Sequence, residues 1–163
     1  MADASYLGTD LSLGFISTDN GSTIAGPFSR VDLQPVLNTS VSPRARDLDT
    51  RTGFANLVQS LIVRLLTERG ELALLGHPDY GSRHHRLIGE PNTVANRNLV
   101  KLYMIECIKQ EPRIASIVKI DVELREGLIN RDKAFVTMAL QVKGGVPDPL
   151  SLVIPFSFAG PLT

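Results

Sequence analysis

The 163-residue sequence is poor in several features on which whole classes of function depend. Its single cysteine, Cys107, excludes an internal disulfide and, because it falls in a helical pattern, is expected to be a small buried residue. Seventeen basic and seventeen acidic residues cancel, which argues against duplex DNA or an anionic membrane as the dominant partner. No apolar run approaches the ~20 residues of a spanning helix, and residues 1–15 lack the basic start of a secretory signal. We therefore expect a protein made in the cytoplasm, with no nucleic-acid partner and no membrane partner.

The local signatures of nucleophilic, phosphate-binding and metal chemistry are also missing. There is no Gly-x-Ser-x-Gly frame, and Gly144-Gly145 has no following helix with which to hold a phosphate. His77, Asp79, His84 and His85 fall within nine residues. Adjacent residues diverge by about 100° on a helical turn, however, whereas metal ligands must converge on one point. The sequence predicts no cofactor and no metal site, with histidines that pack or pair locally at the surface.

Glycosidase chemistry is the enzymatic alternative that remains. A lysozyme-type enzyme needs two carboxylates that face each other across a sugar, one of them with a raised pKa in an apolar pocket. Carboxylates are present, but no pattern fixes a pair of them around a cleft: Glu68, Glu71, Asp79, Glu90 and Glu106. We expect a protein without catalytic residues, and we keep a cell-wall-degrading glycosidase as the alternative.

The composition indicates a folded core. It also changes along the chain, from a polar N-terminal region to an apolar core region. A hydrophobic fraction of 43% and a mean hydropathy of +0.06 are typical of one globular domain with room for a tail. Residues 1–47 are rich in Gly, Ser, Thr, Asp and Pro and show no helical period. They predict an extended N-terminal arm with one or two short strands. The segment Pro43-Arg44-Ala45-Arg46 marks a boundary, after which residues 48–163 form the core.

Two helices are expected in the first half of this core. Apolar residues at helical spacing mark one face of the first helix: Phe54, Leu57, Val58, Leu61, Ile62, Leu65 and Leu66. Gly70 is predicted to end it. A second helix begins at a cap, Asn92 or Thr93, and runs to about Gln110, because Pro112 disfavours helical geometry at the preceding residue. Its apolar residues are Leu99, Leu102, Tyr103, Ile105 and Ile108, and a short helical turn is expected near Arg83–Ile88.

After Arg113 the apolar period changes from 3.6 to 2, which is typical of strands with one buried face. The three alternating sets are Val118, Ile120, Val122 and Leu124; Ala134, Val136, Met138, Leu140 and Val142; and Leu150, Leu152, Ile154, Phe156 and Phe158. Loops are predicted near Gly127 and at Gly144–Pro149. The fold class is therefore α+β, with an antiparallel sheet of about three strands covered on one face by the two main helices.

The pair Glu111 and Arg113 allows two interpretations. Two residues apart in an extended segment, their side chains point to the same side and form either an exposed ion pair worth roughly 0–1 kcal/mol or an arginine offered to a neighbouring chain. Composition alone does not decide between them.

The order of several proline motifs gives the chain a family resemblance. The motifs are Leu65-Leu66-Thr67-Glu68-Arg69-Gly70-Glu71, Pro78-Asp79-Tyr80-Gly81-Ser82-Arg83, Glu90-Pro91-Asn92, Glu111-Pro112-Arg113, and Asp148-Pro149-Leu150 with Ile154-Pro155-Phe156. In this order and spacing the chain resembles the small baseplate wedge protein that initiates the tail sheath in contractile-tailed phages and phage-tail-like injection systems. Ile154 stands where an aromatic is common, and Leu74-Leu75-Gly76-His77 lengthens the approach to Pro78.

The resemblance implies a structural protein of the inner baseplate, present in multiple copies in a ring. Its implied partners are larger wedge proteins, the sheath protein, and tube or hub proteins. Glu111, Pro112 and Arg113 would contact the wedge. The C-terminal strand, with Leu150, Leu152, Ile154, Pro155 and Phe156, would contact the sheath.

Pro155 adds a physical argument for the sheath contact. A proline has no N–H to donate, so within a sheet it belongs at an edge. An edge strand leaves unpaired backbone groups that a strand from another chain can complete. We therefore expect the first sheath layer to add a strand to the sheet at this C-terminal edge.

Overall fold

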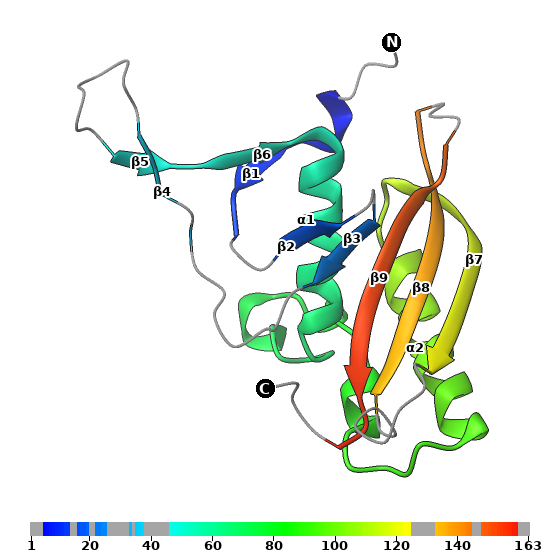
Figure 1. The fold of residues 1–163 in the computed structure, drawn as a ribbon. Helices are drawn as coiled ribbons and strands as arrows, with labels where there is room; N and C mark the ends of the chain where they lie inside the picture. Colours follow the sequence, from blue (N-terminus) through cyan, green and yellow to red (C-terminus); the bar gives the residue numbers. More distant parts are fainter. Residues whose placement is uncertain are drawn as a thin grey trace.

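The chain folds around two helices and a curved sheet (Figure 1). The computed structural model describes residues 5–13, 16–19, 22–25, 33, 35–37, 46–124, 133–144 and 148–159. The elements in chain order are η1 (Ser5–Leu7), β1 (Thr9–Leu11), β2 (Ile16–Asp19), β3 (Ser22–Ala25), β4 (Pro35–Leu37), β5 (Arg46–Leu48), β6 (Thr50–Thr52), α1 (Gly53–Leu66), η2 (Ala73–Leu75), η3 (His84–Leu87), α2 (Val94–Lys109), β7 (Ile114–Leu124), β8 (Lys133–Val142) and β9 (Leu150–Ser157). The expected α+β class is confirmed. No helix in the described ranges is long and apolar enough to cross a membrane.

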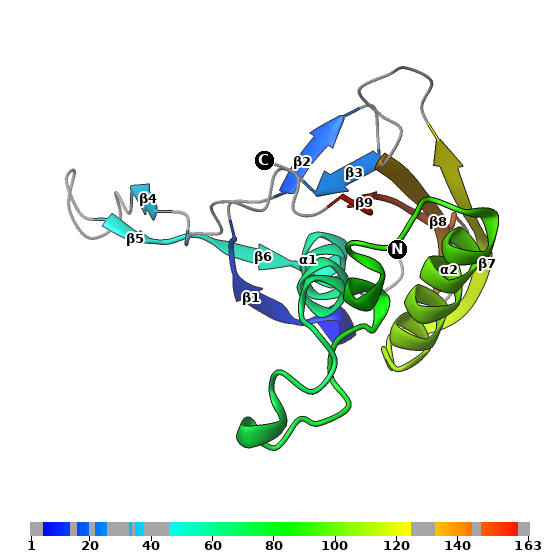
Figure 2. The ribbon, with the colours of Figure 1, turned by 90° about the horizontal axis from the view of Figure 1, so that it is seen from below.

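The main sheet has five strands in the order β2-β3-β9-β8-β7. Its antiparallel part, β7, β8 and β9, contains the three strands that the sequence predicts. The β2–β3 hairpin extends it, with β3 parallel to β9. Figure 2 shows α1 and α2 on the same, concave side of the sheet. The N-terminal region therefore supplies two strands of the sheet, which its lack of alternating apolar residues did not reveal.

The first long strand begins earlier than its alternation indicates and is irregular. Its register against β8 shifts between Ile114 and Ser116 and again between Ile117 and Lys119. An irregularity of this kind turns later side chains to the other face. Val118, which was predicted to be buried, is 60% exposed, whereas Ile114 and Ile120 are buried. The other two strands keep the predicted inward faces.

The helices agree with their predicted positions but differ in detail. Helix α1 ends at Leu66, four residues before Gly70, and Thr67 is its C-cap. Thr93 caps α2, its side-chain oxygen accepting from Asn96 N–H at 3.1 Å. The buried face of α2 is Val100, Met104, Cys107 and Ile108, whereas Leu102 is 47% exposed. Apolar residues of α2 lie on several of its sides, so the periodicity of the sequence alone does not identify the face that is buried.

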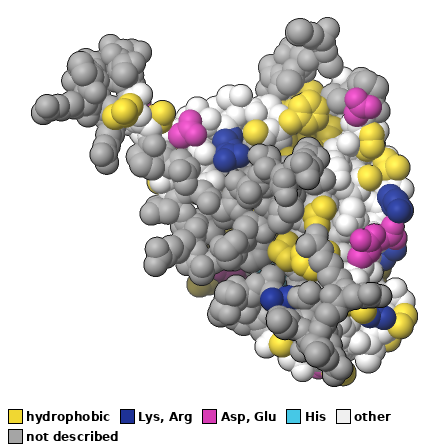
Figure 3. Space-filling view, in the orientation of Figure 1, with side chains coloured by type: hydrophobic (Ala, Val, Ile, Leu, Met, Phe, Trp, Pro, Cys, Tyr) yellow, Lys and Arg dark blue, Asp and Glu magenta, His cyan; other side chains and the backbone are white. Residues whose placement is uncertain are grey.

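The N-terminal segment packs onto the core instead of leaving it. Leu7 in η1 is fully buried within the core cluster, and β1 pairs with β6 immediately before α1. The β4–β5 ribbon projects from the body (Figure 1) and exposes Val36 and Leu37. In Figure 3, basic and acidic side chains lie close together along the side of the molecule formed by β7. The boundary after residue 47 falls within β5 and stays a prediction, and the loop near Gly127 lies outside the described residues.

Candidate functional site

The Glu-Pro-Arg motif lies where α2 passes into β7, and its glutamate is turned inward. Glu111 is 4% exposed, and its backbone N–H donates to the Ile108 carbonyl at 2.9 Å. Its Oε1 accepts from Arg113 Nε at 2.6 Å and from Arg113 N at 3.3 Å, and its Oε2 lies 3.7 Å from an Arg64 nitrogen. Burial raises the pKa of Glu111, but the hydrogen bonds and charge of Arg113, followed by the charge of Arg64, bring it below its usual value. The carboxylate is held ionised between two guanidinium groups.

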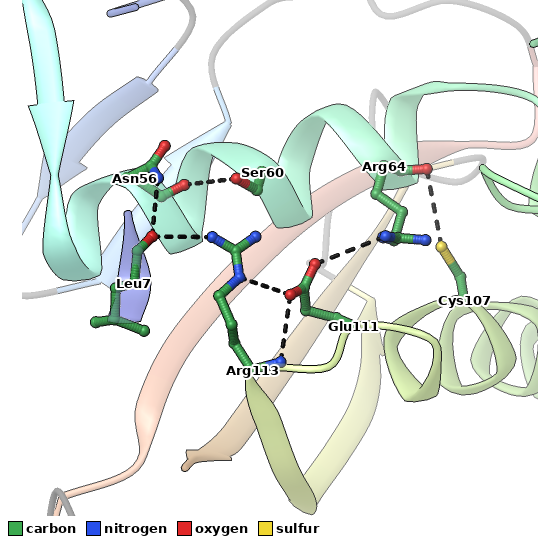
Figure 4. Close-up of polar contacts among 7 residues, drawn as sticks. All are labelled: Leu7, Asn56, Ser60, Arg64, Cys107, Glu111 and Arg113. Carbon is green, nitrogen blue, oxygen red and sulfur yellow. Dashed lines mark hydrogen bonds and ion pairs between the residues drawn. The ribbon is translucent and has the colours of Figure 1, made fainter. Parts of the chain in front are cut away.

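Arg113 ties the N-terminal segment to the core (Figure 4). One of its terminal nitrogens donates to the Leu7 carbonyl at 3.1 Å, which also accepts from Asn56 Nδ2 at 2.9 Å. The side chain of Arg113 is only 21% exposed. The pair is therefore not an exposed ion pair, because Glu111 and Arg113 are largely buried and bond to one another and to the N-terminal backbone. Contact of this motif with a wedge protein stays a prediction.

Arg64 is a central residue of this cluster that the sequence interpretation missed. Its guanidinium lies 4.4 Å from the Tyr80 ring centroid, and its buried Nε has no hydrogen-bond partner among the described residues. Burial raises the pKa of Tyr80. An open pocket of about 340 Å³ lies beside them, lined by Arg64, Gly76, His77, Pro78, Asp79, Tyr80 and Gln110. The available signal was a lone arginine one position before the buried Leu65 in an otherwise apolar half of α1.

Two of the three histidines are held by local contacts inside the structure. His84 is 4% exposed, its Nδ1 lies 2.8 Å from Ser82 Oγ, and its ring packs edge-on against Phe156. His85 Nε2 lies 2.9 Å from the Leu65 carbonyl, and the two imidazole centroids are 4.1 Å apart. The predicted surface position is wrong for His84, because the turn before η3 carries it under β9. The described residues contain no group of three or more His, Cys, Asp or Glu side chains arranged to hold a metal ion.

The other candidate carboxylates face solvent or basic partners. Asp79 pairs with Arg69 at 2.6 Å, and Glu106 pairs with Arg83. Neither the pocket beside Arg64 nor a groove between α2 and β7 is lined by two carboxylates. Cys107 is buried as predicted, and burial raises its pKa to about 11, so it remains a thiol.

The predicted sheath-binding strand is not an edge of the sheet. β9 lies between β8 and β3, and β3 pairs with Leu152 and Val153. Leu152, Ile154 and Phe156 are buried in the core, and Leu150 packs against it. The prediction that β9 is an edge strand is wrong, because β3 of the N-terminal hairpin pairs with part of β9. The stretch of β9 that follows Val153, including Pro155, has no partner in β3 among the described residues.

Comparison with known proteins places the fold. No protein-family model matches the sequence, and no curated protein matches it. The structure is similar to the crystal structure of a protein from Geobacter sulfurreducens that is provisionally named a tail lysozyme, with a TM-score of 0.53 and 23% sequence identity. The match covers 63% of this chain and 88% of that chain. A likeness at this identity establishes the fold alone, so the chain shares the fold of a protein named for a tail.

Proposed function

We propose that this chain is a structural component of the baseplate of a contractile tail or injection system, where it joins wedge subunits and initiates the sheath. The observation that carries the proposal is the fold shared with a tail protein over 63% of the chain. Two of the proline motifs support it, because they meet in one place: Arg64 contacts both Tyr80 of the second motif and Glu111 of the fourth. A baseplate protein must hold a fixed shape, and this cluster fixes the N-terminal segment, α1 and the start of β7 together.

The name of the structural relative makes lysozyme activity the second candidate. A general acid for glycoside cleavage needs a raised pKa in an apolar site. Among the described residues the buried carboxylate Glu111 has the opposite property, because Arg113 and Arg64 lower its pKa. We therefore favour a protein without hydrolase activity. Release of soluble fragments from peptidoglycan by the purified chain, abolished by Glu111→Gln or Glu106→Gln in a variant that still folds, would establish the enzymatic alternative.

The sheath contact is proposed at the part of β9 beyond Val153. A sheath strand would pair with the backbone there, since the inward side chains Ile154 and Phe156 belong to the core. Deletion of the strand cannot test this contact. Removal of all residues after Gly145 would delete four buried core side chains and unfold the protein: Leu152, Ile154, Phe156 and Phe158.

The test is therefore made in particles assembled by the full chain. A photo-crosslinking amino acid is placed at Pro155, whose outward side chain is partly exposed, with the same substitution at exposed Val94 on α2 as control. We expect position 155 to capture the sheath protein and position 94 not to do so. Electron microscopy of cells without the gene should show loss of sheathed particles. Normal sheaths without the gene would contradict the proposed function.

A further inference from the structure

Two leucines at the tip of the connector between α1 and η3 stand in solvent. Leu74 is 100% exposed and Leu75 is 73% exposed, and every residue from Ala73 to Asp79 is exposed. Figure 2 shows this connector, in green, projecting from the body of the molecule. Contiguous exposed apolar side chains mark interaction sites, whereas single scattered ones are ordinary. We call Leu74 and Leu75 the leucine tip.

The leucine tip is held in a defined conformation before any partner binds. Backbone N–H groups of Ala73, Leu75 and His77 donate to carbonyl oxygens earlier in the connector at 3.0–3.1 Å. At the base, Arg69 pairs with Asp79 at 2.6 Å and closes the connector. A projection that is already ordered loses less conformational entropy on binding than a mobile loop does.

A groove between α2 and β7 has matching chemistry on another side of the same chain. Its volume is about 610 Å³, and its walls combine apolar and basic side chains. The apolar lining includes Ile105, Ile117 and Val118, and the lysines are Lys101, Lys109 and Lys119. Asp121 forms ion pairs with two of these lysines. Its Oδ1 lies 3.6 Å from Lys101 Nζ, and its Oδ2 lies 2.8 Å from Lys119 Nζ. The three lysines thus outnumber the acid that they contact.

The surroundings of the leucine tip carry the opposite charge. Glu68, Glu71 and Asp79 flank it, and the cations beside them are Arg69, which pairs with Asp79, and the largely buried Arg64. We propose that the leucine tip of one copy docks in the α2–β7 groove of a second copy, with the flanking carboxylates facing the lysines. Because tip and groove are different surfaces, this contact is heterologous and repeats around a ring if the rotation closes. The ring itself rests on the proposed function, whereas the contact between two copies does not.

A contact of this size is weak between free molecules. Two leucines bury far less surface than a stable dimer requires, so we expect a dissociation constant on the order of 0.1 mM. Closure of a ring on a baseplate would strengthen it through effective concentration.

The experiment uses the purified full chain. Sedimentation equilibrium up to about 1 mM should show association, and NMR shifts should move with concentration at the tip and along β7 together. Leu74→Asp combined with Leu75→Asp should weaken association at least tenfold. Val94→Asp, which also changes an exposed apolar residue and places the charge at a helix N-terminus, should leave it unchanged.

Complementation distinguishes this contact from general stickiness. Val118→Asp or Lys109→Glu in the groove should also abolish association, and both positions are exposed enough to leave the fold intact. A mixture of the tip variant with a groove variant keeps one intact contact and should form a 1:1 dimer. A wild-type chain that stays monomeric to 1 mM, or a mixture that forms no dimer, would overturn the proposal. Neither result would bear on sheath loss in particles, so the two proposals fail separately.

Discussion

The two halves of the connector between α1 and α2 contain similar residues and have opposite fates. The first half, Ala73–Asp79, includes a leucine pair, a glycine and a histidine that all face solvent. The second half, Gly81–Leu87, also contains a glycine, histidines and a leucine, yet Gly81, His84 and Leu87 are buried. Residue type alone therefore does not decide which half packs.

The difference arises where the second half meets the end of α1. Ser82 N–H donates to the Thr67 carbonyl at 2.9 Å, and Arg69 N–H donates to the Ser82 carbonyl at 3.1 Å. These bonds bring the backbone of Gly81 against α1 and direct His84 toward Phe156. The first half has no comparable bridge in the described residues and projects. The comparison teaches that two backbone hydrogen bonds divide the connector into a packed half and an exposed half.

The largest expected effect tests the glycines of the two halves. Gly81 has φ +99°, and a Cβ there would lie 2.6 Å from the Thr67 carbonyl oxygen. Gly81→Ala should therefore lower the free energy of unfolding by about 4 kcal/mol, through backbone strain and a forced shift of α1. Gly76 has φ +87° but nothing within 4 Å, so Gly76→Ala should cost only about 1 kcal/mol. Urea denaturation of both variants measures the difference, and equal costs would remove the proposed division.

The buried ion cluster extends the comparison to a second motif. Glu111→Ala leaves Arg64 and Arg113 without their carboxylate and should cost about 3 kcal/mol, whereas exposed Glu90→Ala should cost less than about 0.5 kcal/mol. Arg113→Ala should cost about 2 kcal/mol, because it also frees the Leu7 carbonyl from one of its two donors. Chemical denaturation checks each value. Near-wild-type stability of Arg113→Ala would favour the intermolecular role over the internal one.

A pH titration of stability tests the burial of His84. Burial, and then the charge of His85, lowers the pKa of His84 from 6.5 to about 3. Between pH 6.5 and about 3, His84 binds a proton in the unfolded chain but not in the folded chain. The contribution of His84 to the free energy of unfolding is therefore fully present above pH 6.5 and is lost as the pH decreases. At pH 5 the loss should be about 2 kcal/mol.

The variant His84→Gln isolates this effect. If it folds, its stability should change less between pH 7 and pH 5 than that of the wild type. His77→Gln makes the same substitution at an exposed position and serves as the control for the change of residue type. Measurements stop at pH 5 because Glu111, whose pKa is lowered, loses its own stabilising contribution at more acidic pH. An unchanged slope in His84→Gln would assign the acid sensitivity to other groups.

The smallest expected effect concerns the leucine tip. Leu74→Ser should change the free energy of unfolding by less than about 0.5 kcal/mol, because its side chain is fully exposed. Leu87→Ser, at a position 6% exposed, should cost about 3 kcal/mol. Thermal melts of the two variants compare the halves of the connector directly. A marked loss in Leu74→Ser would place the tip in the fold instead of an interface.

The predictable parts of the fold are those with one strongly apolar face. The periodicity of α1 and the alternation of β8 and β9 were enough to place these elements, since one buried face dominates each. The predicted cap at Asn92 or Thr93 was enough to place the start of α2. Val118 was misplaced because the register shifts in β7 defeat simple alternation. The β2–β3 hairpin was missed because its short strands carry mixed polar residues whose pairing is with distant β9. The motif residues were found, but Arg64 and the Leu7 carbonyl were not, since nothing local links them.

By itself, the sequence determined the α+β class, the inward faces of α1, β8 and β9, and the turns at its proline motifs, because these depend on neighbours along the chain. The tertiary structure alone decided what those motifs contact. It placed Glu111 between Arg64 and Arg113, brought Leu7 to Arg113 across more than a hundred residues, and covered part of β9 with β3. It also left Leu74 and Leu75 outside. Burial and charge pairing join residues that are far apart in sequence, and the packed chain alone brings them within reach.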